Sequence, residues 1–591
     1  MAEARLSAAR EDSANRLGGK VRSMSKAGPM GVYEWQVIAE DLLDYLAALS
    51  AGGSGLDTPE AKAVLRDAAE ASIGAVTHTA YFSNTRFSVF LNYVNFGMSH
   101  DPYDPDTGGE RGSITARDWS EAVCLGVLTG RNTSSHGEAF YFARQAFADQ
   151  AQGTPPGELA TGLYAQVMDG SDDEDADYPL SDQVKLAALD AAIARLRAHA
   201  EESGDGRLLA HPDTLALAVL RAVAVEDRAA FDTALAELLH KESTLHGEHA
   251  PARSLLPLIP LGLAAHAYRT HGWLPAVDSG YLPHALVTGF EKQGPRVAGL
   301  GRDRRPDAVA ALAAGPLVVD RPEYDCTVHP ETEALFEASV AEALAPKDGG
   351  TPSVWRLGSA ADDQELLFKR RAAAGVTTDA QLRNLVVASR ARAAVFRLAL
   401  AEPGTEVEVT VDGMTARFPA GRTKEASPGA WQRAVALALI TGAREDLAPL
   451  VLAGPTVASE DGSAATAYRR ALHAYLTGDD PEAAAERALH EREKAEEWGF
   501  LPAPAVLLSQ LVEGDEESFN LALADALETH RDYYAVGDRV DDTTATVNLD
   551  VLALACHARR RGWSIRVESP YLPERILRMA EAIRPTEEVA E

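Results

Sequence analysis

An internal repeat constrains the fold of this chain more than any other sequence feature. Three blocks recur in the same order at offsets of 312 (431 − 119), 288 (515 − 227) and 290 (562 − 272) residues: WSEAVCLGVLTG at 119–130 with WQRAVALALITG at 431–442, DRAAFDTALAELL at 227–239 with DEESFNLALADAL at 515–527, and GWLPAVDSGYLP at 272–283 with GWSIRVESPYLP at 562–573. Conserved order and spacing are the signature of a duplicated unit. The 591 residues therefore predict two homologous lobes of about 290 residues, in place of the four domains that length alone suggests.

The change of offset locates an insertion in the first half, and composition locates the boundary between the halves. The first half holds a net excess of 24 residues (312 − 288) between its first two blocks, an interval that contains the acidic stretch GSDDEDADYPLSD at 170–182. The glycine- and arginine-rich segment 291–307 lies between the halves and is typical of a seam. We expect four segments: a flexible or short helical arm at 1–26, a first lobe at 27–290, a basic linker at 291–310 and a diverged second lobe at 311–591.

Helical patterns dominate both halves. From Trp35 an apolar residue returns every three or four positions as far as Leu49, and Thr58 followed by Pro59 is typical of a helix start. Further helices are predicted at 182–200 and from Asp480 to about Ala495. The stretch YRRALHAYLTGDDPEAAAERAL resembles a tetratricopeptide-type hairpin, in which helix pairs bury their faces against neighbouring pairs. The predicted fold is all-α, with helical hairpins stacked as α-α repeats in each lobe.

One β-hairpin is expected near 405–418. Val407, Val409 and Val411 alternate with polar residues, and Asp412-Gly413 suits a type I′ turn. The hairpin either packs as a flap or offers an edge to a partner, and packing is the favoured interpretation because lone hairpins need a covering helix. The matched Trp273 and Trp563 are likewise expected to pack rather than to anchor an interface.

Charge excludes several classes of partner. Lys and Arg number 56 against 88 Asp and Glu, so the formal charge is −32, which disfavours binding to nucleic acid or to an anionic membrane.

Cys124, Cys326 and Cys556 are too far apart for a disulfide framework or a zinc site. The longest apolar run, 255–267, is too short to span a membrane, and the N-terminus lacks the apolar core of a secretory signal. We therefore expect a cytoplasmic protein that binds neither nucleic acid nor membrane.

No pattern in the sequence predicts catalysis. HGEH at 246–249 lacks the spacing that places two histidines around zinc, and the run from Ser135 to Glu138 places a hydroxyl beside an imidazole only in sequence. Cys556-His557 is interpreted as a packed thiol in a helix, and the arginines of GLGRDRR at 299–305 as a solvated hinge. We predict no catalytic, metal-binding or cofactor-binding residues, and hence no enzyme.

The acidic run of the insertion is the candidate binding element. It comprises Asp172, Asp173, Glu174, Asp175 and Asp177. The run lacks the ligand spacing of an EF-hand, so calcium binding is not expected. A solvated loop is the favoured interpretation, and contact with a basic partner is the alternative, because clustered carboxylates speed association with positive surfaces.

Three segments carry a resemblance to a known family. They are AGPMGVYEWQVIAEDLLDYLAALS at 27–50, NYVNFGMSHDP at 92–102 and RTHGWLPAVDSGYLPHALVTG at 269–289. They resemble actinobacterial members of the immunity protein 49 family, all-α immunity proteins of bacterial polymorphic-toxin systems. The resemblance covers about residues 27 to 290, and the internal repeat extends it to the second half.

The resemblance implies a function but no catalytic residues. It implies a protein that binds and neutralises a cognate toxin, and an acidic surface suits toxins with basic clefts, such as nuclease or deaminase domains. Two other classes stay open: a helical scaffold or adaptor that binds another protein or peptide, and an enzyme whose site assembles only in space, for example around His136 and Glu138.

Overall fold

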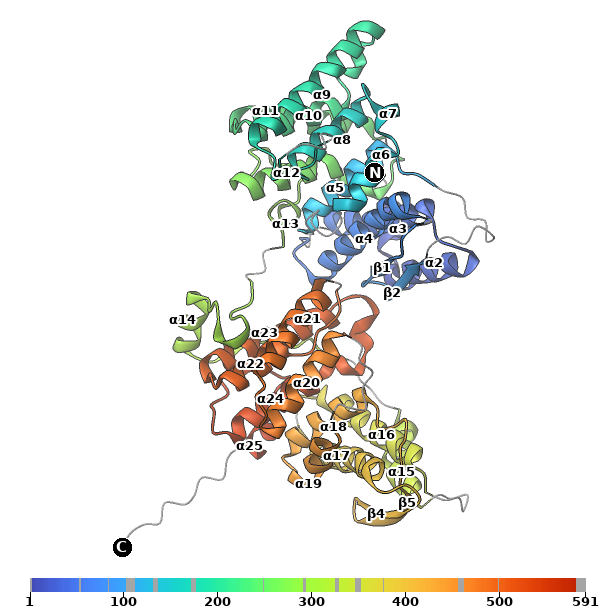
Figure 1. Ribbon diagram of the computed structural model, residues 1–591, viewed down its shortest axis with the longest axis vertical. Helices are drawn as coiled ribbons and strands as arrows, with labels where there is room; N and C mark the ends of the chain where they lie inside the picture. Colours follow the sequence, from blue (N-terminus) through green and yellow to red (C-terminus); the bar gives the residue numbers. More distant parts are fainter. Residues whose placement is uncertain are drawn as a thin grey trace. The chain divides into compact units, whose positions relative to one another are not determined.

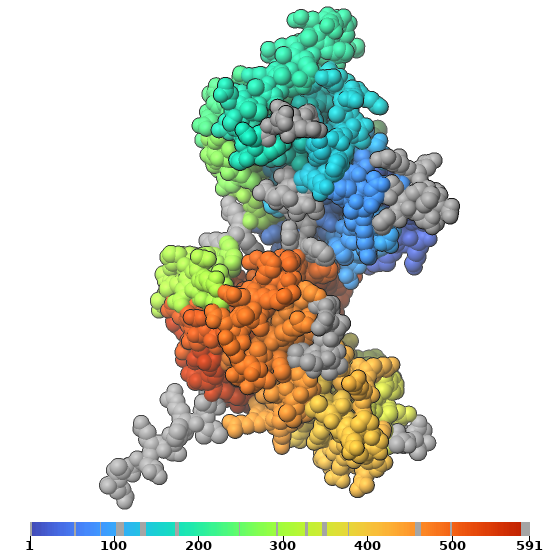
Figure 2. Space-filling view, in the orientation of Figure 1, coloured from blue at the N-terminus to red at the C-terminus, as the bar shows by residue number. Residues whose placement is uncertain are grey.

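A computed structural model gives the fold of the chain (Figure 1). The described residues are 3–52, 55–82, 84–101, 112–130, 137–171, 177–247, 249–290, 294–324, 329–345, 352–375, 377–454, 462–497 and 499–580. Contacts divide the chain into two units, Met1–Lys292 and Gln293–Glu591. The fold is all-α, as predicted, with a few short strands. In each unit, side chains fill the spaces that the ribbons leave (Figure 2).

Unit 1 is a helical assembly with one hairpin on α4. Its helices are α1 Glu3–Arg10, α2 Ser13–Ala27, α3 Val32–Ala51, α4 Pro59–Tyr81, α5 Ala116–Thr129, α6 Gly137–Gln145, α7 Ala148–Ala151, α8 Pro155–Gln166, α9 Asp182–Ser203, α10 Pro212–Ala224, α11 Arg228–Leu245, α12 Leu258–His271 and α13 His284–Thr288. Strands β1 Phe87–Leu91 and β2 Phe96–His100 form the antiparallel hairpin. Helices α3 and α4 pack against each other, as do α5 and α12, and α10 and α11.

Local chemistry explains where the predicted helices begin. The Thr58 hydroxyl accepts a hydrogen bond from the Ala61 amide, and Pro59 occupies the first turn of α4, where no amide donor is needed. Ser181 caps α9 in the same way. Helix α9 extends three residues beyond its predicted end at residue 200. The N-terminal residues form α1 and α2, which both pack on α3, and Leu17 and Val21 of α2 are buried.

Unit 2 has a similar order of elements. Its helices are α14 Pro306–Ala314, α15 Pro330–Leu344, α16 Val354–Ala372, α17 Asp379–Leu400, α18 Pro428–Thr441, α19 Arg444–Ala453, α20 Ala464–Thr477, α21 Glu482–Glu497, α22 Ala505–Glu513, α23 Glu516–Tyr534, α24 Leu549–Arg560 and α25 Glu574–Met579. Strands β4 Glu406–Val411 and β5 Met414–Pro419 form an antiparallel hairpin, and β3 Leu317–Val318 pairs in parallel with β6 Val567–Glu568.

The predicted hairpin is present, but the expectation of a single hairpin is wrong. Strands β4 and β5 turn at Asp412 and Gly413, which both adopt positive φ, and buried Val409 and Val411 face the core. The hairpin of β1 and β2 was not expected. Its turn is held by Asp67 of α4, whose carboxylate accepts the amides of Asn92 at 2.8 Å and Tyr93 at 2.7 Å. A turn fixed by a side chain from a distant helix leaves no local signal in the sequence.

The matched blocks occupy equivalent positions in the two units. The indole nitrogen of Trp119 in α5 donates to the Phe140 carbonyl at 2.9 Å, and that of Trp431 in α18 donates to the Leu450 carbonyl at 2.9 Å. Both helices end at a left-handed glycine, Gly130 or Gly442. These contacts agree with a duplication, although common descent of the halves stays a prediction.

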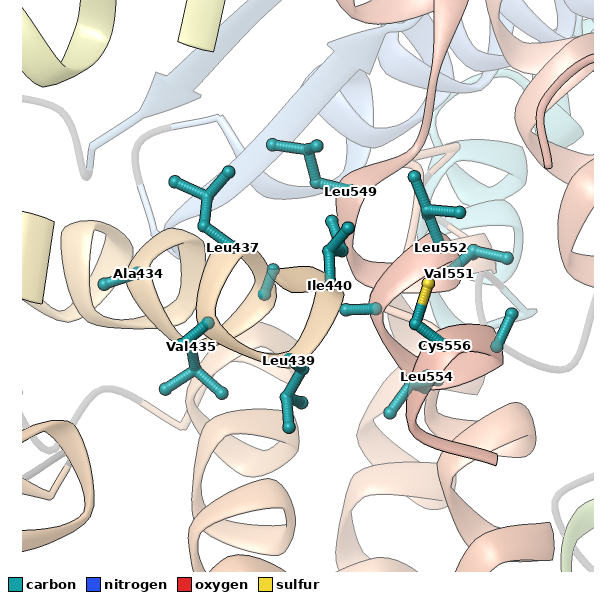
Figure 3. Packing of buried hydrophobic residues seen from close by; sticks show 14 of the residues in the cluster. Ala434, Val435, Leu437, Leu439, Ile440, Leu549, Val551, Leu552, Leu554 and Cys556 are labelled. Atoms are coloured by element: carbon teal, nitrogen blue, oxygen red, sulfur yellow. The ribbon is translucent and has the colours of Figure 1, made fainter. Parts of the chain in front are cut away.

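The packing of α18 against α24 shows how the core of unit 2 is filled (Figure 3). Leu437 and Ile440 of α18 and Leu552 and Cys556 of α24 are buried in the core cluster. Arg560 at the end of α24 caps α18 by donating to the carbonyls of Leu439 and of Ile440, the latter at 2.6 Å. In unit 1, Arg269 of α12 donates to the Leu128 carbonyl at 3.2 Å in the corresponding place.

The basic segment before α14 is not the solvated hinge that its arginines suggested. Arg296 pairs with Asp525 at 2.7 Å and with Glu528 at 2.8 Å, both on α23. Arg302 pairs with Glu486 at 3.2 Å. In addition, Arg304 pairs with Asp515 and Glu517, Arg305 pairs with Asp307, and Val297 is fully buried. The acidic surface of α21 to α23 therefore holds this segment as part of unit 2.

Candidate functional site

The predicted acidic run is described only at one end. Asp172, Asp173, Glu174 and Asp175 lie outside the described residues. Asp177 is described and exposed. The assignment of these carboxylates to a binding surface therefore stays a proposal.

Both ends of the acidic loop are fixed to the body of unit 1. The Asp169 carboxylate accepts the Leu180 amide at 3.2 Å across the loop and pairs with Lys185 of α9 at 2.7 Å. Leu180 is buried, whereas the neighbouring Tyr178 is 59% exposed. This anchoring holds Asp177 and Tyr178 at a defined place on the surface between α8 and α9.

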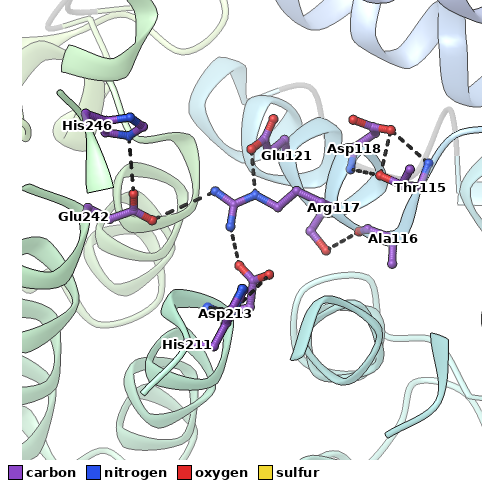
Figure 4. Close-up of polar contacts among 10 residues, drawn as sticks. Thr115, Ala116, Arg117, Asp118, Glu121, His211, Asp213, Glu242 and His246 are labelled. Atoms are coloured by element: carbon purple, nitrogen blue, oxygen red, sulfur yellow. Dashed lines mark hydrogen bonds and ion pairs between the residues drawn. The ribbon is translucent and has the colours of Figure 1, made fainter. Parts of the chain in front are cut away.

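A second charged cluster, which we call the Arg117 cluster, joins α5, α10 and α11 (Figure 4). Arg117 of α5 donates to Glu121 at 2.8 Å and pairs with Asp213 at the start of α10. Its guanidinium is 3.9 Å from Glu242 of α11. The side chains of Asp213 and Glu242 are 2% and 5% exposed. One cation therefore holds two buried carboxylates and a third at the rim.

Two histidines border the Arg117 cluster. His211 Nδ1 lies 3.6 Å from Asp213 and accepts the Asp213 backbone amide at 3.2 Å, and His246 Nε2 lies 3.8 Å from Glu242. Burial raises the pKa of Glu121 and of Glu242, and the charge of Arg117 opposes that rise. The groups bind one another, so the cluster holds three helices together and presents no activated nucleophile.

Little in the sequence indicates the Arg117 cluster. Arg117 and Asp213 are 96 residues apart, and neither lies in a recognisable motif. The only local signal is the pairing of Arg117 with Glu121 four residues later, which is common on helix surfaces.

The other sequence candidates do not assemble into a site. Ser135, His136 and Glu248 lie outside the described residues, as does Cys326. Burial raises the pKa of the Cys556 thiol to about 12, and His557 contacts the Tyr475 hydroxyl at 2.9 Å. Both are packed groups, as the sequence predicted for Cys556.

The described residues contain neither a metal-binding cluster nor a membrane-spanning helix. Across the described residues, no group of three or more His, Cys, Asp or Glu could hold a metal ion. Within that same part of the chain, no helix is long and apolar enough to cross a membrane.

A comparison with known families decides the relationship that the three sequence segments suggested. The sequence model of immunity protein 49 matches residues 56–286 and 374–576, which is more than half of the chain. The chain belongs to the immunity protein 49 family. The matched ranges of this immunity protein run from just before α4 to α13 in unit 1 and from just before α17 to α25 in unit 2. Neither the curated proteins nor the solved structures contain a match. Membership of an immunity protein family implies a toxin as the partner.

Proposed function

We propose that this protein binds a cognate polymorphic toxin in the cytoplasm and neutralises it by forming a stoichiometric complex. The observation that carries the proposal is the match of the immunity protein 49 family to both units. Inhibition by occupation of a toxin's active cleft requires shape and charge complementarity, and it needs no catalytic group, metal or cofactor. The charged groups of the Arg117 cluster pair with one another, so the cluster fits a role in holding helices together and not a role in catalysis.

The charge of the protein supports a basic toxin. A net charge of −32 favours encounter with a positive surface, and nuclease and nucleic-acid deaminase domains carry such surfaces because they bind phosphate backbones. The acidic loop concentrates part of that charge, and its anchored ends keep Asp177 exposed at a defined place. We propose that Asp172, Asp173, Glu174, Asp175 and Asp177 contact the toxin at the rim of the interface.

Neutralising the loop is expected to slow binding. Replacing the four aspartates with asparagine and Glu174 with glutamine should lower the association rate constant for the candidate toxin, the product of the adjacent gene, by about tenfold at low salt. The dependence of that rate on salt should also weaken. Stopped-flow or surface plasmon resonance measurements on purified proteins would show both effects.

A matched variant controls for total charge. It removes five exposed carboxylates from unit 2 by glutamine substitution: Glu331, Glu402, Glu406, Glu408 and Glu445. Equal slowing by both variants would show that bulk charge, not the loop, governs encounter. If the unmodified protein does not bind this toxin, the proposed function is wrong for that partner.

A further inference from the structure

Unit 1 carries a continuous row of aromatic side chains that the family relationship does not explain. The row, called here the aromatic row, consists of Tyr81, Phe142, Tyr141, Tyr164 and Tyr178. Ring centroids are 6.4 Å apart for Tyr81 and Phe142, 5.3 Å for Phe142 and Tyr141, and 6.3 Å for Tyr141 and Tyr164. The row connects the end of α4 with α6, α8 and the acidic loop.

Hydrogen bonds through one loop residue attach the last ring. The Tyr164 hydroxyl donates to the Ser171 carbonyl at 3.4 Å, and the Ser171 amide donates to the Tyr178 hydroxyl at 3.3 Å. The ring of Tyr164 is buried and stacks under Arg144, whose guanidinium carbon is 4.7 Å from its centroid. Tyr164 and Arg144 therefore form a rigid base for the outer rings.

The outer rings of the row face solvent. Phe142 is 41% exposed and Tyr178 is 59% exposed. Exposure of large aromatic groups loses the hydrophobic stabilisation that burial would provide, and such groups dominate the binding energy of protein interfaces. A rigid support combined with exposed rings is the arrangement expected of an interface that is preformed before its partner binds.

The surroundings of the row define the chemistry of the partner. Exposed acidic residues lie on α6, α7 and the loop, at Glu138, Asp149 and Asp177. Arg144, by contrast, is buried beneath the row. Burial raises the pKa of the Tyr81 hydroxyl, and the negative charge of Glu138 raises it further. An apolar centre with an acidic rim complements a partner that has an apolar spot surrounded by basic groups.

We propose that the aromatic row is the energetic centre of the toxin interface, with Phe142 and Tyr178 as its anchors. This inference rests on the proposed function and assigns its site within unit 1. The loop carboxylates at the rim speed encounter, whereas the rings slow dissociation by burying apolar area against the toxin.

Unit 2 offers a matched position that lacks the row. The indole nitrogens of the matched tryptophans donate to the carbonyls of Phe140 in unit 1 and Leu450 in unit 2. Phe142 and Leu452 each lie two residues further along the chain, so they occupy corresponding positions. Leu452 is 78% exposed, and the residue corresponding to Tyr141 is Val451. An exposed apolar side chain therefore recurs in unit 2 without its neighbouring ring.

The test compares dissociation rates from the toxin encoded beside this gene. The double variant Phe142→Ala and Tyr178→Ala is expected to dissociate at least about 100-fold faster, with little change in the association rate, because hot-spot side chains act mainly on dissociation. Leu452→Ala is expected to dissociate at the unmodified rate. Thermal unfolding of each free variant reports whether its fold is intact.

A second variant keeps the test decisive if the alanine variant unfolds. Tyr178→Lys places a positive charge on an exposed position of the row and should also weaken binding to a basic toxin. Unchanged dissociation of folded row variants, or equal loss of affinity in Leu452→Ala, would overturn the assignment while the proposed function stands. No binding by the unmodified protein would instead overturn the proposed function.

Discussion

Replacing Arg117 with leucine is expected to lower the free energy of unfolding of unit 1 by about 3–5 kcal/mol at pH 7. The substitution removes the cation shared by Asp213, Glu121 and Glu242 and leaves buried carboxylates without a compensating charge. Denaturant unfolding followed by circular dichroism would measure the loss, and the transition of unit 1 is the one expected to move.

The pH dependence of the unfolding free energy of Arg117→Leu shows whether uncompensated charge causes the loss of stability. Without Arg117 the pKa values of Glu121 and Glu242 rise further above their ordinary values, so the folded state binds protons that the unfolded state releases. Stability lost at pH 7 should therefore return in part as the pH falls toward 5. Arg207→Leu, which removes a fully exposed partner of Asp205, should leave unfolding unchanged. A loss that is equal at both pH values would show that packing, not uncompensated charge, explains the effect.

Acid is expected to destabilise both units because each contains two buried or half-buried histidines with a lowered pKa. Burial lowers the pKa of His78 and His266 in unit 1, and of His530 and His557 in unit 2, to about 4. The ordinary histidine pKa is about 6.5, so between these values the unfolded state binds protons that the folded state does not. The stability contribution is complete above pH 6.5 and decreases as the pH falls toward 4, by about 1.4 kcal/mol per pH unit for each histidine.

Several carboxyls whose pKa is raised by burial oppose this trend: Glu121 and Glu242 in unit 1, and Asp363, Asp446, Asp525 and Asp550 in unit 2. Burial raises the pKa of Asp550 to about 6, so protonation of Asp550 stabilises the folded state as the pH falls below that value. The loss of stability in acid is therefore smaller in each unit than the histidines alone would produce.

A histidine variant tests this linkage. His530→Leu should reduce the slope of unfolding free energy against pH between 6 and 4.5 by about 1.4 kcal/mol per pH unit, because one titrating group is removed. His530 is fully buried, and its Nδ1 lies 3.2 Å from the Asn548 amide nitrogen. His240→Gln, at an exposed position of α11, should keep the original slope. An unaltered slope in His530→Leu would exclude His530 as a source of acid sensitivity.

Features set by nearby residues could be predicted from the sequence. The starts of α4 and α9 follow from the capping chemistry of Thr58 and Ser181, and the β4–β5 turn follows from Asp412-Gly413. The packing of the matched tryptophans was also predicted: Trp273 contacts Phe231 at a ring distance of 5.8 Å, as Trp563 contacts Phe519 at 5.5 Å.

Features set by distant residues could not be predicted. The β1–β2 hairpin depends on Asp67, and the Arg117 cluster joins three helices that the sequence separates widely. Arg296 was assigned only to a basic linker at 291–310, because its partners, Asp525 and Glu528, lie more than 200 residues away. The aromatic row was missed for the same reason, since its rings come from four separate segments.

Survival of cells that express the neighbouring toxin is the most direct measure of the central claim. The toxin gene is induced with and without this protein, and colony counts are compared with those for an inactive toxin variant. The account predicts that cells survive only when the immunity protein is present and that it co-purifies with the toxin at a fixed molar ratio. Equal killing with and without the protein, at matched expression, would contradict it.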